Sequence, residues 1–173
     1  MINILKCFWG RRRASVCLGF AVAGLLLAAG LNTLALAAED VLSRQLPVAD
    51  FSVAREALVE SIEAEGLTVR EVIPFNRMLE RTAAALGKTG SPFVNVEIVQ
   101  FCSSALSWQM LEEDVTQIAL CPLSVVILLS HAEPDRVTLA WRSPGQATAG
   151  RRRAGELLQK LVERAVDIGQ RRR

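Results

Sequence analysis

The chain has 173 residues, of which 51% are apolar, and its formal net charge is +2. This length predicts one globular domain with extensions. The charge is unevenly distributed, because Lys6 and the arginines at 11–13 precede an apolar run and all 18 acidic residues follow it. Without these four, 16 basic residues stand against 18 acidic ones, a net charge of −2, which argues against a domain built to bind nucleic acid.

The first 38 residues have the layout of a secretory signal peptide. A basic segment ends at Arg13, an uncharged run spans 14–38, and small residues close it at Ala35-Leu-Ala37-Ala38. This pattern predicts cleavage after Ala37 or Ala38. The alternative is an uncleaved anchor in the inner membrane, because a membrane helix needs only about 20 apolar residues. Both interpretations place the remaining chain outside the cytoplasm, in the periplasm or the extracellular space.

The exported part shows alternating strand and helix patterns. Helix 52–65 is the clearest, because apolar residues recur at three- and four-residue steps after a candidate cap, either Asp50 or Ser52, and Gly66 follows. The other predicted helices are 74–86, 104–113 and 151–168. The predicted strands are 41–46, 67–73, 93–101, 122–130 and 136–142.

The strand at 122–130 is almost wholly apolar, which predicts a central strand that is buried on both faces. Turn residues at 133–135 separate it from the strand at 136–142, so the two are expected to form a hairpin.

Residues 50–145 resemble the domain-of-unknown-function 302 family. The resemblance rests on Glu65-Gly-Leu-Thr-Val69, Val99-Gln-Phe-Cys-Ser-Ser-Ala-Leu106, Leu120-Cys-Pro-Leu123 and Val137-Thr-Leu-Ala-Trp-Arg-Ser-Pro144. It implies a small α+β domain with an antiparallel four- to five-stranded sheet, helices packed on one face, and frequent dimers. The family has no established activity. The expected organisation is a leader at 1–38, the α+β domain at 39–145 and a basic amphipathic helix at 146–173.

Two cysteines are expected to remain after Cys7 and Cys17 leave with the leader. An even pair in an exported protein predicts a disulfide between Cys102 and Cys121. The resemblance implies that strands 93–101 and 122–130 are antiparallel neighbours, which brings both cysteines to the same end of the sheet. A redox-active pair and two unpaired buried thiols remain as alternatives. A metal site that also uses His131 lacks an evident fourth ligand, so no metal is predicted.

The sequence contains no nucleophile elbow, phosphate-binding loop, zinc-protease or dinucleotide motif. We therefore predict no catalytic residue and no cofactor. Trp108, His131 and Trp141 are the candidates for lining a ligand pocket, although each also fits a structural or solvated role.

The C-terminal tail, residues 146–173, differs in charge from the body of the chain, residues 38–145. Residues 146–173 contain 8 basic and 3 acidic residues, whereas residues 38–145 contain 8 basic and 15 acidic ones. The simpler interpretation is a helix packed on the sheet with a frayed basic end. The alternative is contact with an anionic membrane surface or an acidic envelope partner. The residues that would make this contact are Arg151, Arg152, Arg153, Arg171, Arg172 and Arg173. Opposite charges on tail and body also favour a homodimer.

Two functional hypotheses follow. The first is an exported, non-enzymatic α+β module that binds a small ligand or a partner protein and is stabilised by the Cys102–Cys121 disulfide. The second is a thiol–disulfide or metal-linked redox protein that uses the same two cysteines.

Overall fold

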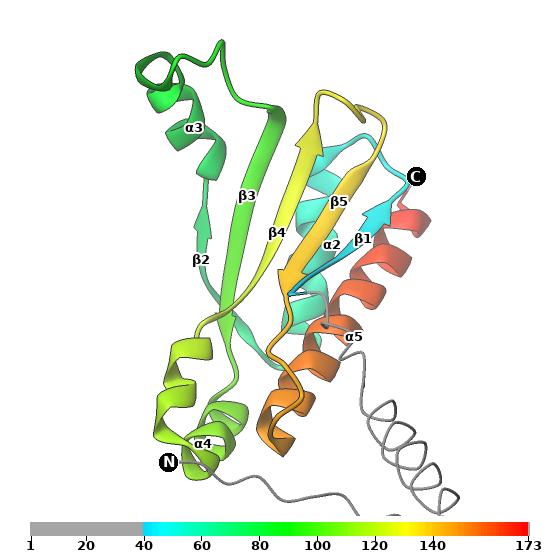
Figure 1. Ribbon diagram of the computed structural model, residues 1–173. Coiled ribbons are helices and arrows are strands. Elements are labelled where there is room, and N and C mark those ends of the chain that lie inside the picture. Colours follow the sequence, from blue (N-terminus) through cyan, green and yellow to red (C-terminus); the bar gives the residue numbers. More distant parts are fainter. Residues whose placement is uncertain (1–39, 173) are drawn as a thin grey trace, which may run out of the picture. The chain divides into compact units, whose positions relative to one another are not determined.

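The computed structural model describes residues 40–172, and its centre is a five-stranded antiparallel sheet with the strand order β1-β5-β4-β3-β2 (Figure 1). The strands are β1 (Val41–Leu46), β2 (Thr68–Ile73), β3 (Phe93–Cys102), β4 (Leu123–Ser130) and β5 (Val137–Arg142). The helices are α2 (Phe51–Glu63), α3 (Phe75–Ala83), α4 (Ser104–Glu113) and α5 (Ala149–Arg171), with short 3-10 helices η1 (Ala84–Leu86) and η2 (Val115–Leu120). The predicted α+β class and antiparallel sheet are confirmed. The predicted leader, with Cys7 and Cys17, lies outside the described residues.

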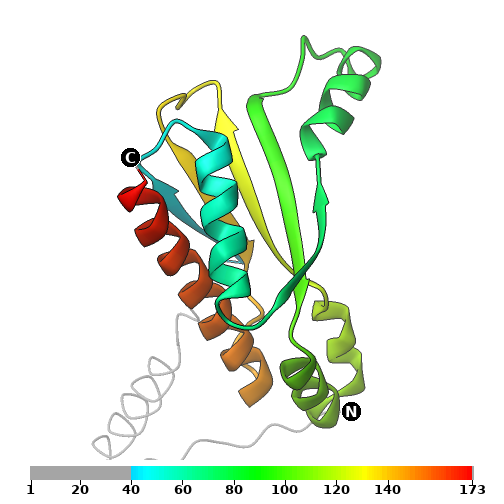
Figure 2. The same ribbon diagram turned by 180° about the vertical axis from the view of Figure 1, so that it is seen from behind.

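Helices α2 and α5 lie side by side across one face of the sheet (Figure 2). Strand β4 is central, as its apolar run predicts, and its odd-numbered residues from Leu123 to Leu129 are buried in the core shared with these helices. Its even-numbered residues, such as Val126 and Leu128, are only half-buried. The prediction that this strand is buried on both faces is therefore wrong, because both long helices lie on the same side of the sheet.

Helices α2 and α5 are joined by a buried hydrogen bond. The hydroxyl of Ser61 in α2 donates to the carbonyl oxygen of Leu161 in α5 at 2.7 Å. This bond satisfies a fully buried hydroxyl within an otherwise apolar contact. At its start, α2 is capped by Asp50, one of the two predicted candidates, which accepts from the N–H of Ser52 at 2.8 Å. Within residues 40–172, no helix has both the length and the apolar character needed to cross a membrane.

Two helical segments end at glycines with positive φ, as predicted. Gly66 follows α2 with a φ of 71°, and Gly87 follows η1 with a φ of 65°. Residues with a side chain rarely adopt this left-handed backbone conformation, whereas glycine adopts it freely. The predicted helix at 74–86 is divided in the structure, because its last turn tightens into η1.

Helix α5 begins two residues earlier than predicted because Glu113, the last residue of α4, forms hydrogen bonds with the backbone of its first turn. The two carboxylate oxygens of Glu113 accept from the backbone N–H of Gly150 at 2.8 and 3.0 Å. The hydroxyl of Thr148 accepts from the N–H of Arg151 at 3.3 Å. The first N–H groups of a helix have no partner within the helix, so these contacts stabilise the start of α5. Glu113 lies 37 residues earlier in the chain, beyond the reach of a local capping pattern.

The segment after α4 forms η2, for which no element was predicted. Asp114 caps it by accepting from the N–H of Thr116 at 2.8 Å. Gln117 is buried and accepts from the hydroxyl of Thr148 at 3.2 Å. The segment therefore packs against the start of α5, and this tertiary contact determines its conformation.

Replacing Glu113 with glutamine should lower the melting temperature at neutral pH. It should also make the melting temperature of the variant less dependent on pH. The Thr148 hydroxyl and the Gly150 N–H hold the pKa of Glu113 below its ordinary value. A carboxyl whose pKa is lowered by folding stabilises the folded state above its unfolded pKa, and this contribution is lost as the pH falls through the folded pKa. We expect the melting temperature of the unmodified chain to fall more between about pH 6 and about pH 3 than that of Glu113→Gln.

Glu112→Gln is the matched control, because this neighbouring side chain is exposed and has no hydrogen bond or ion pair with the described residues. It should leave the acid dependence of the melting temperature unchanged. Parallel curves for Glu113→Gln and the unmodified chain would contradict the assigned contact.

Candidate functional site

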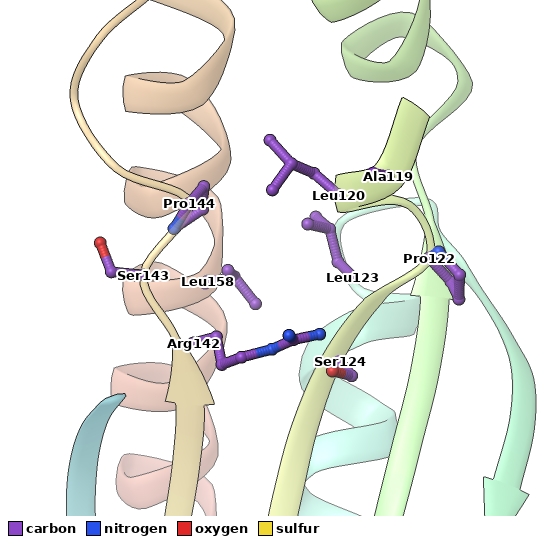
Figure 3. A pocket seen from close by; sticks show the side chains of 9 residues that line it. All are labelled: Ala119, Leu120, Pro122, Leu123, Ser124, Arg142, Ser143, Pro144 and Leu158. Atoms are coloured by element: carbon purple, nitrogen blue, oxygen red, sulfur yellow. The ribbon is translucent and has the colours of Figure 1, made fainter. Parts of the chain in front are cut away.

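The sheet divides at one end, between β4 and β5. These strands pair from Leu129 with Val137 to Val126 with Ala140, and their pairing ends there. Beyond this point β4 stays paired with β3, and β5 stays paired with β1. Had the β4–β5 register continued, Ser124 would lie opposite Arg142. Instead the strand ends separate, and a cleft opens between them (Figure 3).

This β4–β5 cleft has a volume of about 110 Å³. It is lined by Ala119, Leu120, Pro122, Leu123, Ser124, Arg142, Ser143, Pro144 and Leu158. Leu120 and Leu123 project from one side and Pro144 and Leu158 from the other, so apolar side chains lie on both sides of the cleft, beside the polar Ser124, Ser143 and Arg142 (Figure 3). The cleft is smaller than the about 300–1,000 Å³ of sites that hold drug-sized ligands. It therefore fits a small molecule or one end of a larger one.

Arg142 provides the charge of the cleft. Its side chain extends from β5 across the cleft toward Ser124 (Figure 3). The guanidinium forms no ion pair or hydrogen bond with the described residues, whereas other arginines of the domain do. A guanidinium presents five N–H donors in a planar fork that matches a carboxylate. The cleft therefore combines an unpaired cation with an apolar wall.

Cys102 and Cys121 lie at the same end of the sheet, because β3 and β4 are antiparallel neighbours with Phe101 opposite Leu123. The predicted disulfide is nevertheless not formed, and both are free thiols. Phe101 points into the core, so Cys102, the next residue of the strand, faces the opposite side and is exposed. Cys121 packs against the core, and its Sγ lies 3.3 Å from the Oγ of Ser107. The two side chains therefore point apart.

The two thiols should react at different rates with a soluble alkylating reagent. Cys102 lines an open groove with Arg70 and the start of α4, whereas Cys121 is only partly accessible. Because thiol reactivity depends on access, Cys102 should be labelled severalfold faster. Peptide mass spectrometry after timed labelling measures both sites in one sample, with Cys102→Ser and Cys121→Ser as assignment controls. Equal rates, or protection of both thiols until a reductant is added, would contradict this geometry.

The metal-linked form of the redox hypothesis gains no support from the geometry. Among residues 40–172, no three His, Cys, Asp or Glu side chains are grouped so that they could hold a metal ion. Cys102 ends β3, whereas His131 follows Ser130, which pairs with Phe93 at the opposite end of that strand. The length of the strand separates the two candidate ligands.

The three predicted pocket residues occupy different environments. Trp108 lies on α4 and is 68% exposed, and His131 is exposed after β4. Trp141 is 7% exposed and lines a second cavity, between β1, β5 and α5. The structure therefore does not bring these residues together in one site.

The predicted basic contact residues are largely engaged within the domain. Arg151 and Arg152 donate to the carbonyl oxygens of Pro144 and Gln146, and Arg153 donates to the side chain of Gln109. Arg172 forms ion pairs with Glu56 and Glu60 of α2. Arg171 is exposed, and Arg173 lies outside the described residues. Contact with an anionic surface or an acidic partner stays a prediction, as does the homodimer.

Arg142 is the site residue that the sequence analysis did not single out. Its place at the end of an alternating strand made it look like an ordinary exposed residue. The signal that distinguishes it is the loss of pairing between β4 and β5, which no local pattern shows.

The comparisons identify the family and the fold. Residues 42–170 match the family model described as domain of unknown function DUF302. A crystal structure of an uncharacterized conserved DUF302 protein from Bacillus stearothermophilus is similar, with a TM-score of 0.55 and 16% sequence identity. The match covers 79% of this chain and 100% of that one. At this identity the likeness shows the fold alone. No curated protein matches the chain.

Proposed function

The chain belongs to the DUF302 family, and on that premise we propose that it is a non-enzymatic binding module whose β4–β5 cleft holds a small aliphatic carboxylate. The observation that carries this proposal is the unpaired guanidinium of Arg142 beside apolar walls. A carboxylate would accept from the guanidinium, and a short alkyl chain would cover Leu123 and Leu158. No other charged side chain lines this cleft.

The volume of the cleft limits the size of the expected ligand. Its volume of about 110 Å³ suits a chain of a few carbon atoms. The apolar area that such a chain would bury is small, so the charged hydrogen bonds to Arg142 would supply much of the affinity. We therefore expect weak binding that depends strongly on this one side chain.

Titration calorimetry with butyrate tests the proposal. The unmodified protein should bind butyrate saturably, and butanol, which lacks the carboxylate, should bind at least about tenfold more weakly. Arg142→Gln should reduce butyrate affinity by a similar factor while leaving the melting temperature nearly unchanged, because the side chain is exposed. Arg136→Gln, in the exposed β4–β5 turn, is the matched control and should bind normally. Equal butyrate binding by both variants, or none by the unmodified protein, would reject the site.

We also propose that the module acts outside the cytoplasm. The support is the basic, apolar and small-residue layout of residues 1–38. Mass spectrometry of protein recovered from cells should show a chain that begins after Ala37 or Ala38. A full-length chain that an external protease cannot digest in intact spheroplasts would reject export, whereas a full-length chain that it digests would favour the anchored form.

A further inference from the structure

The face of the sheet opposite α2 and α5 carries no helix across β3, β4 and β5 (Figures 1 and 2). The strand register identifies the residues on this open face. One row of directly paired residues crosses four strands and consists of Ile73, Ile98, Val126 and Ala140. All four are half-buried. Because directly paired side chains lie about 5 Å apart, this row forms a continuous apolar surface.

A second pair extends this surface along the strands. Leu128 of β4 pairs with Val96 of β3, two residues beyond the first row. The open-face strip is defined by these two rows together: Ile73, Val96, Ile98, Val126, Leu128 and Ala140. An antiparallel sheet with one face in water normally places polar residues on that face. The strip departs from this pattern, and contiguous apolar surface of this kind is typical of an interaction site.

The charge of the open face favours a second copy of the same chain as its partner. Among the paired strand residues on this face, only Glu71 and Arg142 are charged, their signs cancel, and both lie outside the strip. The domain as a whole is acidic, because residues 38–145 contain 15 acidic and 8 basic residues. An acidic or basic partner would find no opposite charge over the strip, whereas two identical strips do not repel each other.

The dimensions of the open face are sufficient for a weak dimer. Five strands about 4.8 Å apart, each about six residues long, present about 500 Å² on one copy. Two such faces would bury about 1,000 Å² in total, which is near the lower limit for specific interfaces. We therefore expect a reversible dimer.

We propose that the open-face strip is the interface of a homodimer in which the two sheets pack face to face. Two-fold pairing places the same strip on both copies, so each copy covers the apolar residues of the other. The two sheets would lie about 10 Å apart, as in a β-sandwich, with β3 and β4 at the centre. Strand β1 would lie at the margin, and its residues on this face, Ser43 and Gln45, are polar and exposed.

Sedimentation velocity of the purified protein measures the dimer directly. Between about 1 and about 100 µM, the mass should rise reversibly from that of one chain to that of two. Val126→Lys should weaken the dimer at least about tenfold, because it brings two ammonium groups into the apolar contact. The lysine stem can lie along the open face of the monomer, so the fold should persist. Val115→Lys, in the exposed η2 segment, is the matched control and should dimerise normally.

A protein that stays monomeric throughout this range overturns the proposal. A dimer that Val126→Lys leaves intact also overturns it, because the two copies would then meet through another surface. No residue of the strip lines the β4–β5 cleft. Failure of the butyrate experiment therefore leaves the dimer proposal unaffected.

Cross-linking tests the same contact with a smaller change of side chain. In a Cys102→Ser background, a short bismaleimide should join two Val126→Cys chains, while Val115→Cys chains should remain largely monomeric. The same reaction in whole cells, followed by mass spectrometry, identifies what covers the face. A link between two copies supports the homodimer. A link from position 126 to a different protein, or equal yields at positions 126 and 115, overturns it.

Discussion

Replacing Trp141 with alanine should lower the free energy of unfolding by about 3–5 kcal/mol, whereas Trp108→Ala should change it by less than about 0.5 kcal/mol. The substitution is the same, and the difference lies in burial, because Trp141 is 7% exposed and Trp108 is 68% exposed. Removing the buried ring leaves a cavity beneath β5 and α5. Removing the exposed ring takes away little packing.

Denaturant unfolding monitored by circular dichroism measures both values without relying on the tryptophan that is removed. The slope of the unfolding free energy with denaturant should be similar in the two variants, so that the midpoints can be compared directly. Similar losses in both would mean that Trp108 is covered in solution, by a second chain or another partner, and would point to an interface on α4.

Replacing Gly169 with valine should destabilise the domain by about 1–3 kcal/mol. Gly169 lies in α5 where the helix crosses β1 and α2. A Cβ atom there would lie 2.9 Å from Cδ2 of Leu46 and 4.0 Å from Cβ of Ala57. Leu46 is completely buried, so it has little room to move away. The added side chain would therefore separate α5 from the sheet.

Gly155→Val in the same helix is the matched control. The nearest atom to a Cβ at this position is Cδ of Pro144, at an ordinary contact distance of 3.8 Å. Valine has a slightly higher helix propensity than glycine, so the free energy of unfolding should stay within about 0.5 kcal/mol of its original value. Thermal melts of the two variants compare them. If the two substitutions change the free energy of unfolding equally little, Leu46 and α5 can move apart at low cost.

The secondary structure was largely predictable because it depends on local periodicity. The predicted bounds of all five strands lie within two residues of the observed ones, and local patterns indicate Gly66 as the end of α2 and Asp50 as one of two candidate caps. Errors arose where a distant contact determines the result. Helix α5 starts early because Glu113 reaches Gly150, and η2 forms where Gln117 packs against Thr148.

The disulfide prediction failed for a different reason. The family resemblance implied that Cys102 and Cys121 lie at one end of the sheet, and the pairing of Phe101 with Leu123 agrees. Whether two thiols meet depends also on which way each side chain points. That direction is set by Phe101 turning into the core and by Ser107 beside Cys121.

The amino-acid sequence was thus sufficient for the five strands and the four α-helices, because periodicity, caps and turn residues act over a few neighbouring positions. The α+β class and the antiparallel sheet followed from the resemblance of its motifs to the DUF302 family. The candidate sites required the tertiary structure. The cleft exists because β4 and β5 stop pairing after Val126 and Ala140, which leaves Ser124 and Arg142 apart. The second cavity is lined by residues of β1, β5 and α5, which are distant in sequence. Both features depend on how strands and helices diverge in space, and a local sequence pattern carries no information about that divergence.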